Sequence, residues 1–147
     1  MDEARKLVQA GQLEEAARLL ELAREASPGD ATLLFRLAGL NFDLHRLDAA
    51  REYAQAAISI SPATWLYHYL LGLVEREAKH LSDALASLET AASLQSTEGP
   101  VFNALGEVLL EQGQPQAASS AFEKAVNLAP DDATFRQNLT QAKRSQK

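Results

Sequence analysis

The sequence predicts an all-α protein built from stacked helical hairpins, and three observations lead to this prediction. Ala and Leu, which favour helices, make up 51 of the 147 residues. Val and Ile, the β-branched residues that favour strands, number only 5 and 2. Several sequence features also recur with a period of 34 residues. Together these observations indicate a helical repeat rather than a sheet protein.

Proline and alanine mark the repeat. Pro62 lies 34 residues after Pro28 and twice 34 residues before Pro130, and Ser96 occupies the remaining step. The positions twelve and five residues before these four sites are always alanine, namely Ala16, Ala50, Ala84, Ala118, Ala23, Ala57, Ala91 and Ala125. The positions eight residues before are all apolar, namely Leu20, Ala54, Leu88 and Phe122. Such a fixed phase predicts repeated contacts between helices.

Each unit is expected to contain two helices and a turn. Between 102 and 109, and again between 118 and 125, apolar or small residues recur every three or four positions, which is the period of one helix face. Gly113 is suited to end the first helix and Pro115 to begin the second. Each unit is therefore predicted to be a helical hairpin.

In chain order, the pattern places helices in pairs. The predicted pairs cover residues 2–10 and 13–26, 31–44 and 47–60, 64–78 and 81–94, and 99–112 and 115–128. A ninth helix is expected over 133–145, where Phe135, Leu139 and Ala142 share one side. A last helix with one apolar side can cover the end of a stack, whereas the first unit has no comparable cover.

Small residues are expected where the two helices of a hairpin approach each other. Gly72 and Gly106 occupy equivalent positions in the third and fourth units, and Ala38 occupies that position in the second. We expect them to lie opposite Ala50, Ala84 and Ala118.

These residues resemble the tetratricopeptide repeat family, whose pattern is Trp-x2-Leu-Gly-x2-Tyr, then Ala-x3-Phe, then Pro. The matching residues of the unit 99–132 are Phe102, Leu105, Gly106, Leu109, Ala118, Phe122 and Pro130. The units 31–64 and 65–98 match with departures at Asn41, Ala54, His68, Glu75 and Ser96. The resemblance implies one domain over 1–147, with a partial unit over 1–30, a capping helix over 133–147 and the architecture of a right-handed α-solenoid.

The resemblance also implies that the first helices of the units line a concave groove. The expected peptide-binding residues are Phe35, Arg36, Phe42, Asp43, Leu66, Tyr69, Leu70, Leu73, Arg76, Asn103, Glu107, Leu110 and Glu111. Hairpin packing is not expected to require Phe35, Phe42, Tyr69 and Leu73, so an exposed apolar patch is predicted. Alternatively, Phe35 and Tyr69 pack on the neighbouring unit, or a second copy or further repeats cover the patch.

The groove indicates the kind of partner. Some members of the family hold a chaperone's C-terminal carboxylate with Lys and Asn, but the matching positions here are Met1, Arg5, Arg36, Leu66 and Leu70. Chaperone tails are therefore not the expected partner. An apolar centre followed by Glu77, Glu107 and Glu111 predicts a peptide or amphipathic helix with apolar anchors and some basic residues.

Charge excludes nucleic acid as an expected partner. The net charge of −6 divides unevenly, because the only charged residues after position 132 are Arg136, Lys143, Arg144 and Lys147. The remaining 10 basic and 20 acidic side chains give residues 1–132 a net charge of −10, which would repel a phosphate backbone.

The longest nearly apolar run, 65–74, is too short to span a membrane, and the chain starts without a signal-type segment.

No catalytic, cofactor or metal-binding pattern is found. His45 and His80 are expected in exposed turns, and His68 is expected to be packed and hydrogen-bonded. The acidic pair Glu75 and Glu77 is expected on a solvated face. The glycines are scattered and form neither a phosphate loop nor a nucleophile elbow.

The sequence thus predicts a non-enzymatic protein-interaction module, a scaffold or adaptor, with a cytoplasmic location as the default expectation. Two other hypotheses remain at this point. The chain could be the partner-recruiting part of a larger enzyme, such as a glycosyltransferase or a kinase, or it could form homo-oligomers through its first unit.

Overall fold

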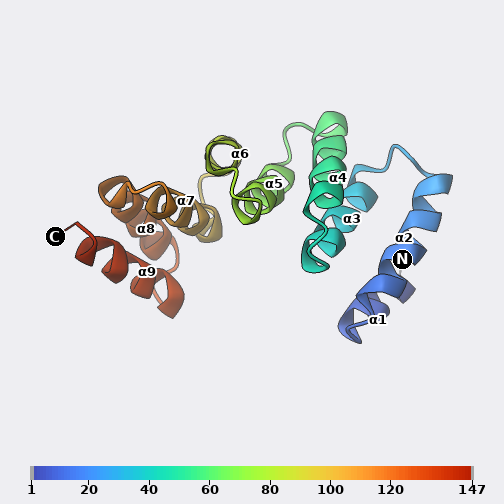
Figure 1. Ribbon diagram of the computed structural model, residues 1–147, viewed down its shortest axis with the longest axis horizontal. Helices are drawn as coiled ribbons and strands as arrows, with labels where there is room; N and C mark the ends of the chain where they lie inside the picture. The colour runs from blue at the N-terminus through green and yellow to red at the C-terminus, as the bar shows by residue number, and fades with distance from the viewer. Residues whose placement is uncertain (1, 147) are drawn as a thin grey trace.

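Nine α-helices follow one another in a row along the part of the chain that the computed structural model describes, residues 2–146 (Figure 1). Met1 and Lys147 lie outside the described residues. The helices are α1 (Asp2–Gln9), α2 (Leu13–Ala26), α3 (Ala31–Asp43), α4 (Leu47–Ile60), α5 (Trp65–Glu77), α6 (Leu81–Leu94), α7 (Gly99–Glu111), α8 (Pro115–Leu128) and α9 (Ala133–Arg144). Every helix lies within one residue of its predicted ends, and no strand occurs in this range. None of these helices is both long and apolar enough to span a membrane.

The turn inside each hairpin closes in the same way four times. The residue at the turn has a positive φ in all four hairpins: 75° at Gly11, 56° at His45, 64° at Lys79 and 74° at Gly113. The next residue donates a backbone hydrogen bond to the carbonyl five positions earlier, at 2.8 to 2.9 Å in each case. This is the helix-ending motif that glycine favours, so His45 and Lys79 adopt a conformation that is less favourable for residues with a Cβ.

Small residues let the two helices of a hairpin approach closely, and large apolar side chains of the second helix lie against them. A Cβ added at Gly72 would lie 2.6 Å from Leu88 Cγ, and one added at Gly106 would lie 2.5 Å from Phe122 Cε1. Both glycines therefore face large apolar side chains of the second helix, and Gly72 also faces Ala84, whose backbone oxygen would lie 3.4 Å from the added Cβ. The four equivalent alanines at the start of the second helices are fully buried, namely Ala16, Ala50, Ala84 and Ala118.

Helix α9 covers the last hairpin, as predicted. Phe135 and Ala142 are buried and Leu139 is half-buried, which places all three against the body of the protein. At the edge of this apolar face, Lys143 lies 3.0 Å from Glu123 of α8. One apolar face and one charged face suit a helix at the end of a stack.

The row of hairpins has an inner and an outer side. Cα atoms of α3 and α5, of α5 and α7, and of α7 and α9 approach within 8 Å of each other. In residues 2–146, the second helices α2, α4, α6 and α8 do not approach one another so closely. The first helices therefore form the concave side, where the expected binding residues lie.

Candidate functional site: the concave face

The apolar residues expected on the concave face are only partly exposed. Phe35, Phe42, Tyr69 and Leu73 pack against the buried core, and each keeps part of its surface uncovered. The expectation that packing does not require these side chains is therefore wrong. Leu70, also expected in the groove, is buried. The remaining expected apolar residues, Leu66 and Leu110, are half-buried.

Two pairs of aromatic rings lie in contact around this face, one pair between α3 and α5 and the other within α5. The ring centroids of Phe35 in α3 and Tyr67 in α5 lie 5.1 Å apart. Those of Trp65 and Tyr69, both in α5, lie 6.1 Å apart. Burial, together with the nearby carboxylate of Glu107, raises the pKa of the Tyr69 hydroxyl above its usual value. These contacts hold the aromatic side chains of the groove in fixed positions.

The polar residues expected near the C-terminal end of the groove bind one another. Arg76 donates hydrogen bonds to Glu107 and to Glu111, and Lys79 Nζ lies 3.1 Å from Glu111 Oε2. We call the connected side chains the Arg76 network; its members are Arg76, Lys79, Asn103, Glu107, Glu111 and Asn138, the last of which donates to Asn103 at 2.9 Å. Burial alone would raise the pKa of Glu111, but the hydrogen bonds from Arg76 and Lys79 outweigh it, and the pKa lies below its usual value. The charges of Glu107 and Glu111 are thus compensated within the protein.

Two other carboxylates of the groove are not compensated in this way. Asp43 and Glu77 occupy equivalent positions in the second and third units, near the ends of α3 and α5, and both are exposed. Neither has a hydrogen-bond or ion-pair partner among the described side chains. Glu111 occupies the same position in the fourth unit but belongs to the Arg76 network. The edge of the groove therefore offers two free negative charges.

A pocket of about 370 Å³ opens between α1 and α3. Its lining residues, most of them absent from the expected binding residues, are Ala4, Arg5, Val8, Leu20, Arg36, Gly39, Leu40 and Asp43. We call it the α1–α3 pocket. Arg36 and Asp43 are among the expected peptide-binding residues, and the repeat pattern also places Arg5, Val8 and Gly39 at groove-facing positions. A signal was nevertheless present, because Gly39 holds a mid-helix position that Leu73 and Glu107 fill in later units.

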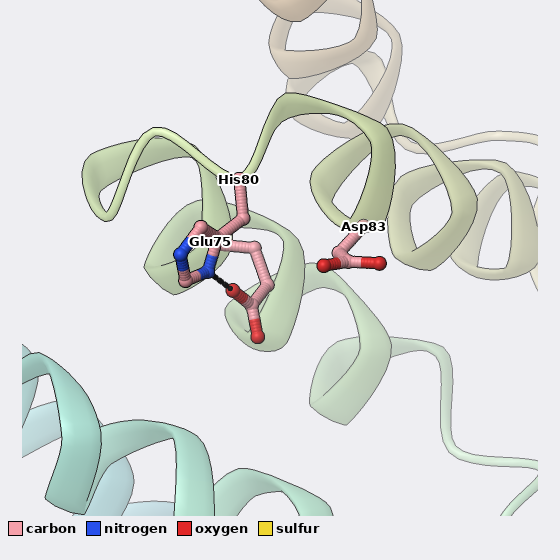
Figure 2. A group of neighbouring side chains, drawn as sticks. All are labelled: Glu75, His80 and Asp83. Carbon is pink, nitrogen blue, oxygen red and sulfur yellow. Dashed lines mark hydrogen bonds and ion pairs between the residues drawn. The ribbon is translucent and has the colours of Figure 1, made fainter.

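The prediction that Glu75 lies on a solvated face is wrong, because its side chain is buried. It accepts hydrogen bonds from Arg51 of α4, with Nε–Oε1 at 2.7 Å and Nη2–Oε2 at 3.2 Å. His80 Nδ1 lies 2.8 Å from Glu75 Oε2, as Figure 2 shows. Burial would raise the pKa of Glu75, but the hydrogen bonds from Arg51 and His80 outweigh it, so the pKa is lowered. No sequence pattern indicates this contact, because Arg51 and Glu75 lie in different units.

The three side chains in Figure 2 are the one group in the described residues that could approach a metal ion together. Asp83 stands apart from the hydrogen bond between Glu75 and His80. Both oxygens of Glu75 already accept from Arg51, whose positive charge would repel a metal ion. The geometry therefore describes an ion pair that joins α4 to α5 rather than a metal centre.

The other histidines lie where they were expected. His45 is exposed in the turn after α3. His68 is half-buried, and its Nε2 lies 2.8 Å from the backbone oxygen of Pro62. His45 is therefore a turn residue, and His68 is a packed residue that contacts the backbone.

Comparison with known proteins agrees with this geometry. Two family models described as tetratricopeptide repeat match residues 7–73 and 100–132, which together make up more than half of the chain. Tetratricopeptide repeat protein 7A of Homo sapiens is 30% identical over 116 residues, covering 79% of this chain and 14% of that protein. The chain thus spans about a seventh of the length of this relative.

Solved structures share the arrangement of the helices. MamA matches with a TM-score of 0.91 at 21% identity, over 99% of this chain and 85% of MamA. The first tetratricopeptide domain of Spaghetti (RPAP3), solved with the HSP90 peptide SRMEEVD, matches with a TM-score of 0.76 at 14% identity, over 78% of this chain and 91% of that one. At such low identity, both similarities concern the fold alone.

Proposed function

This chain belongs to the tetratricopeptide repeat family, and on that premise we propose that it is a non-enzymatic module whose concave face binds a segment of another protein. The segment is an extended peptide or an amphipathic helix with apolar anchors and some basic residues. A neighbour of the same fold solved with a bound peptide supports this reading. The observation that carries the proposal is a fixed, partly exposed apolar row beside two uncompensated carboxylates.

The apolar row suits binding because its side chains are already ordered. Phe35, Phe42, Tyr69 and Leu73 are each held by packing on one side and uncovered on the other. Ordered side chains lose little conformational entropy when a partner binds. Large aromatic surfaces also bury much apolar area for each residue. The row can therefore act as a pre-formed surface for the apolar side of a peptide or helix.

The charges of the groove favour basic groups on the partner. Asp43 and Glu77 are exposed and uncompensated, so a lysine or arginine of the partner can pair with either. Glu107 and Glu111 contribute less, because Arg76 already pairs with both. A basic partner is also attracted by the net charge of −10 of residues 1–132.

Peptide selection followed by mutation tests this function. Random displayed peptides are first selected on the whole chain, and the affinity of a labelled selected peptide is measured by fluorescence anisotropy. The double variant Phe35→Ala with Tyr69→Ala is expected to bind about tenfold more weakly or worse, because truncation removes central apolar contacts. Leu94→Ala is the matched control, since Leu94 is exposed at the end of an outer helix, α6.

Circular dichroism establishes that each variant keeps its helices. A folded double variant that binds the peptide as well as the wild type would contradict binding on the concave face. Equal loss of binding in Leu94→Ala would contradict it as well, because the effect would then not depend on the groove.

A further inference from the structure

We propose that the α1–α3 pocket holds one aliphatic side chain of the bound segment, with an acidic neighbour placed over α1 and a basic neighbour over α3. This inference rests on the proposed function and gives the partner a chemistry, an aliphatic residue between an acidic and a basic one. Three independent features of the pocket carry it: a gap between the helices, a glycine without a packing role, and two charges of opposite sign.

The pocket exists because the first helices separate at this end of the row. Cα atoms of each later pair of first helices approach within 8 Å, but α1 and α3 do not approach so closely in the described residues. The bottom of the gap between them is lined by Ala4, Leu20 and Leu40, which are apolar and buried. Val8 borders it and is 40% exposed. An aliphatic side chain entering the gap would take this surface out of water.

Gly39 lies in the wall of the pocket and has no role in packing the protein. A Cβ added there would meet no atom within 4 Å, whereas one added at Gly72 or Gly106 would collide with the second helix of the hairpin. Glycine inside a helix costs about 1 kcal/mol relative to alanine. Among the described residues, no close packing at Gly39 offsets that cost. An approaching ligand atom would offset it, because glycine lets a ligand come close to the backbone.

The pocket opening carries charges of opposite sign on its two sides. Arg5 belongs to α1 and Asp43 to α3, and both line the pocket and are exposed. Neither has a hydrogen-bond or ion-pair partner in the part of the chain that the structure describes. Arg36 also lines the pocket but already interacts within the protein. A segment with an acidic, an aliphatic and a basic residue in that order would satisfy both free charges and the apolar floor.

The experiment compares peptide selection and binding for the wild type and Gly39→Ala, both as the whole chain. The wild type is expected to enrich random peptides that carry an aliphatic residue between an acidic and a basic one. Gly39→Ala should bind the enriched peptide about tenfold more weakly, since the added methyl group takes the place of a ligand atom that lies against the backbone at Gly39. Its thermal unfolding midpoint should be equal to or higher than that of the wild type, because alanine favours the helix.

Gly29→Ala is the matched control, because an added Cβ at Gly29 also meets no atom but lies outside the pocket. It should bind the peptide as the wild type does. Arg5→Glu should change the preferred acidic residue to a basic one in a new selection.

Several results would overturn the pocket as the anchor site. These are unchanged binding by Gly39→Ala, an unfolding midpoint clearly below that of the wild type, and an unchanged peptide preference in Arg5→Glu. If Phe35→Ala with Tyr69→Ala abolishes binding while Gly39→Ala does not, concave binding stands and the pocket proposal fails. If the folded wild type enriches no peptide at all, the proposed function fails together with the pocket.

Discussion

The two ends of the concave face use the same repeated backbone in opposite ways. At the N-terminal end, α1 and α3 stand apart around an apolar pocket, and Arg5 and Asp43 have no hydrogen-bond or ion-pair partner among the described residues. At the C-terminal end, the first helices approach each other, and the Arg76 network connects α5, α7 and α9. One end therefore offers open surface and free charge, whereas the other has satisfied its polar groups internally.

The difference arises from side chains at equivalent positions. Gly39 of the second unit corresponds to Leu73 of the third and Glu107 of the fourth. Likewise, Phe42 corresponds to Arg76. Larger and complementary side chains close the C-terminal end, whereas at the other end the first helices stand apart and Gly39 adds no side chain to the gap. In a repeat protein the backbone sets where a site can lie, and a few substitutions decide where it does.

The largest expected effect concerns the junction between the two ends, where Arg51 of α4 pairs with buried Glu75 of α5. We expect Arg51→Ala to lower the free energy of unfolding by about 2–3 kcal/mol, because it leaves a buried carboxylate without its cation. Urea unfolding at neutral pH measures this loss. Arg46→Ala is the control, since Arg46 pairs with Glu14 at a site where both side chains are about half exposed, and we expect it to cost less than about 1 kcal/mol. Equal losses in both variants would contradict a special role for the junction.

A smaller effect is expected in acid. The pKa of Glu75 is lowered in the folded protein, so its contribution to stability is present above the usual value of 4.5 and is lost as the pH falls through the lowered pKa. In Arg51→Ala the main cause of the lowering is gone. The difference in unfolding free energy between wild type and variant should therefore shrink below about pH 4.5. Urea unfolding over a pH series measures it, and a constant difference would show that Glu75 and Arg51 are not coupled.

The sequence predicts the fold almost completely, and the reason is the repeat. Four units in phase identify the same contacts independently, so the helix ends agree within one residue. The capping role of Phe135 and Ala142 follows from the same spacing. Such contacts occur within one unit or recur between neighbouring units, and a periodic sequence pattern predicts both kinds.

The site is less predictable, because it depends on departures from the pattern. Glu75 stands where the family has an aromatic residue, and nothing in its own helix indicates that Arg51 would neutralise it. The partial burial of Phe35 and Tyr69 depends on how closely successive units approach, which spacing does not encode. The pocket at Gly39 depends on the separation of α1 from α3. All three features depend on how far apart neighbouring units lie, whereas the sequence pattern specifies mainly the structure within one unit.

The variant with the smallest expected effect on stability is one that makes the C-terminal end of the concave face resemble the N-terminal end. Arg76→Ala removes the cation that Glu107 and Glu111 share, and we expect it to lower the free energy of unfolding by about 1 kcal/mol, since these side chains are partly exposed. Glu107 would then have no paired cation and Glu111 would keep only Lys79, so a basic peptide selected on the wild type should associate faster, with a steeper dependence on salt. Stopped-flow fluorescence at two salt concentrations measures the association rate, and Arg24→Ala is the control because Arg24 pairs with Glu21 in the outer helix α2. Unchanged association in Arg76→Ala, or equal acceleration in both variants, would show that the C-terminal acids do not contribute to the binding face.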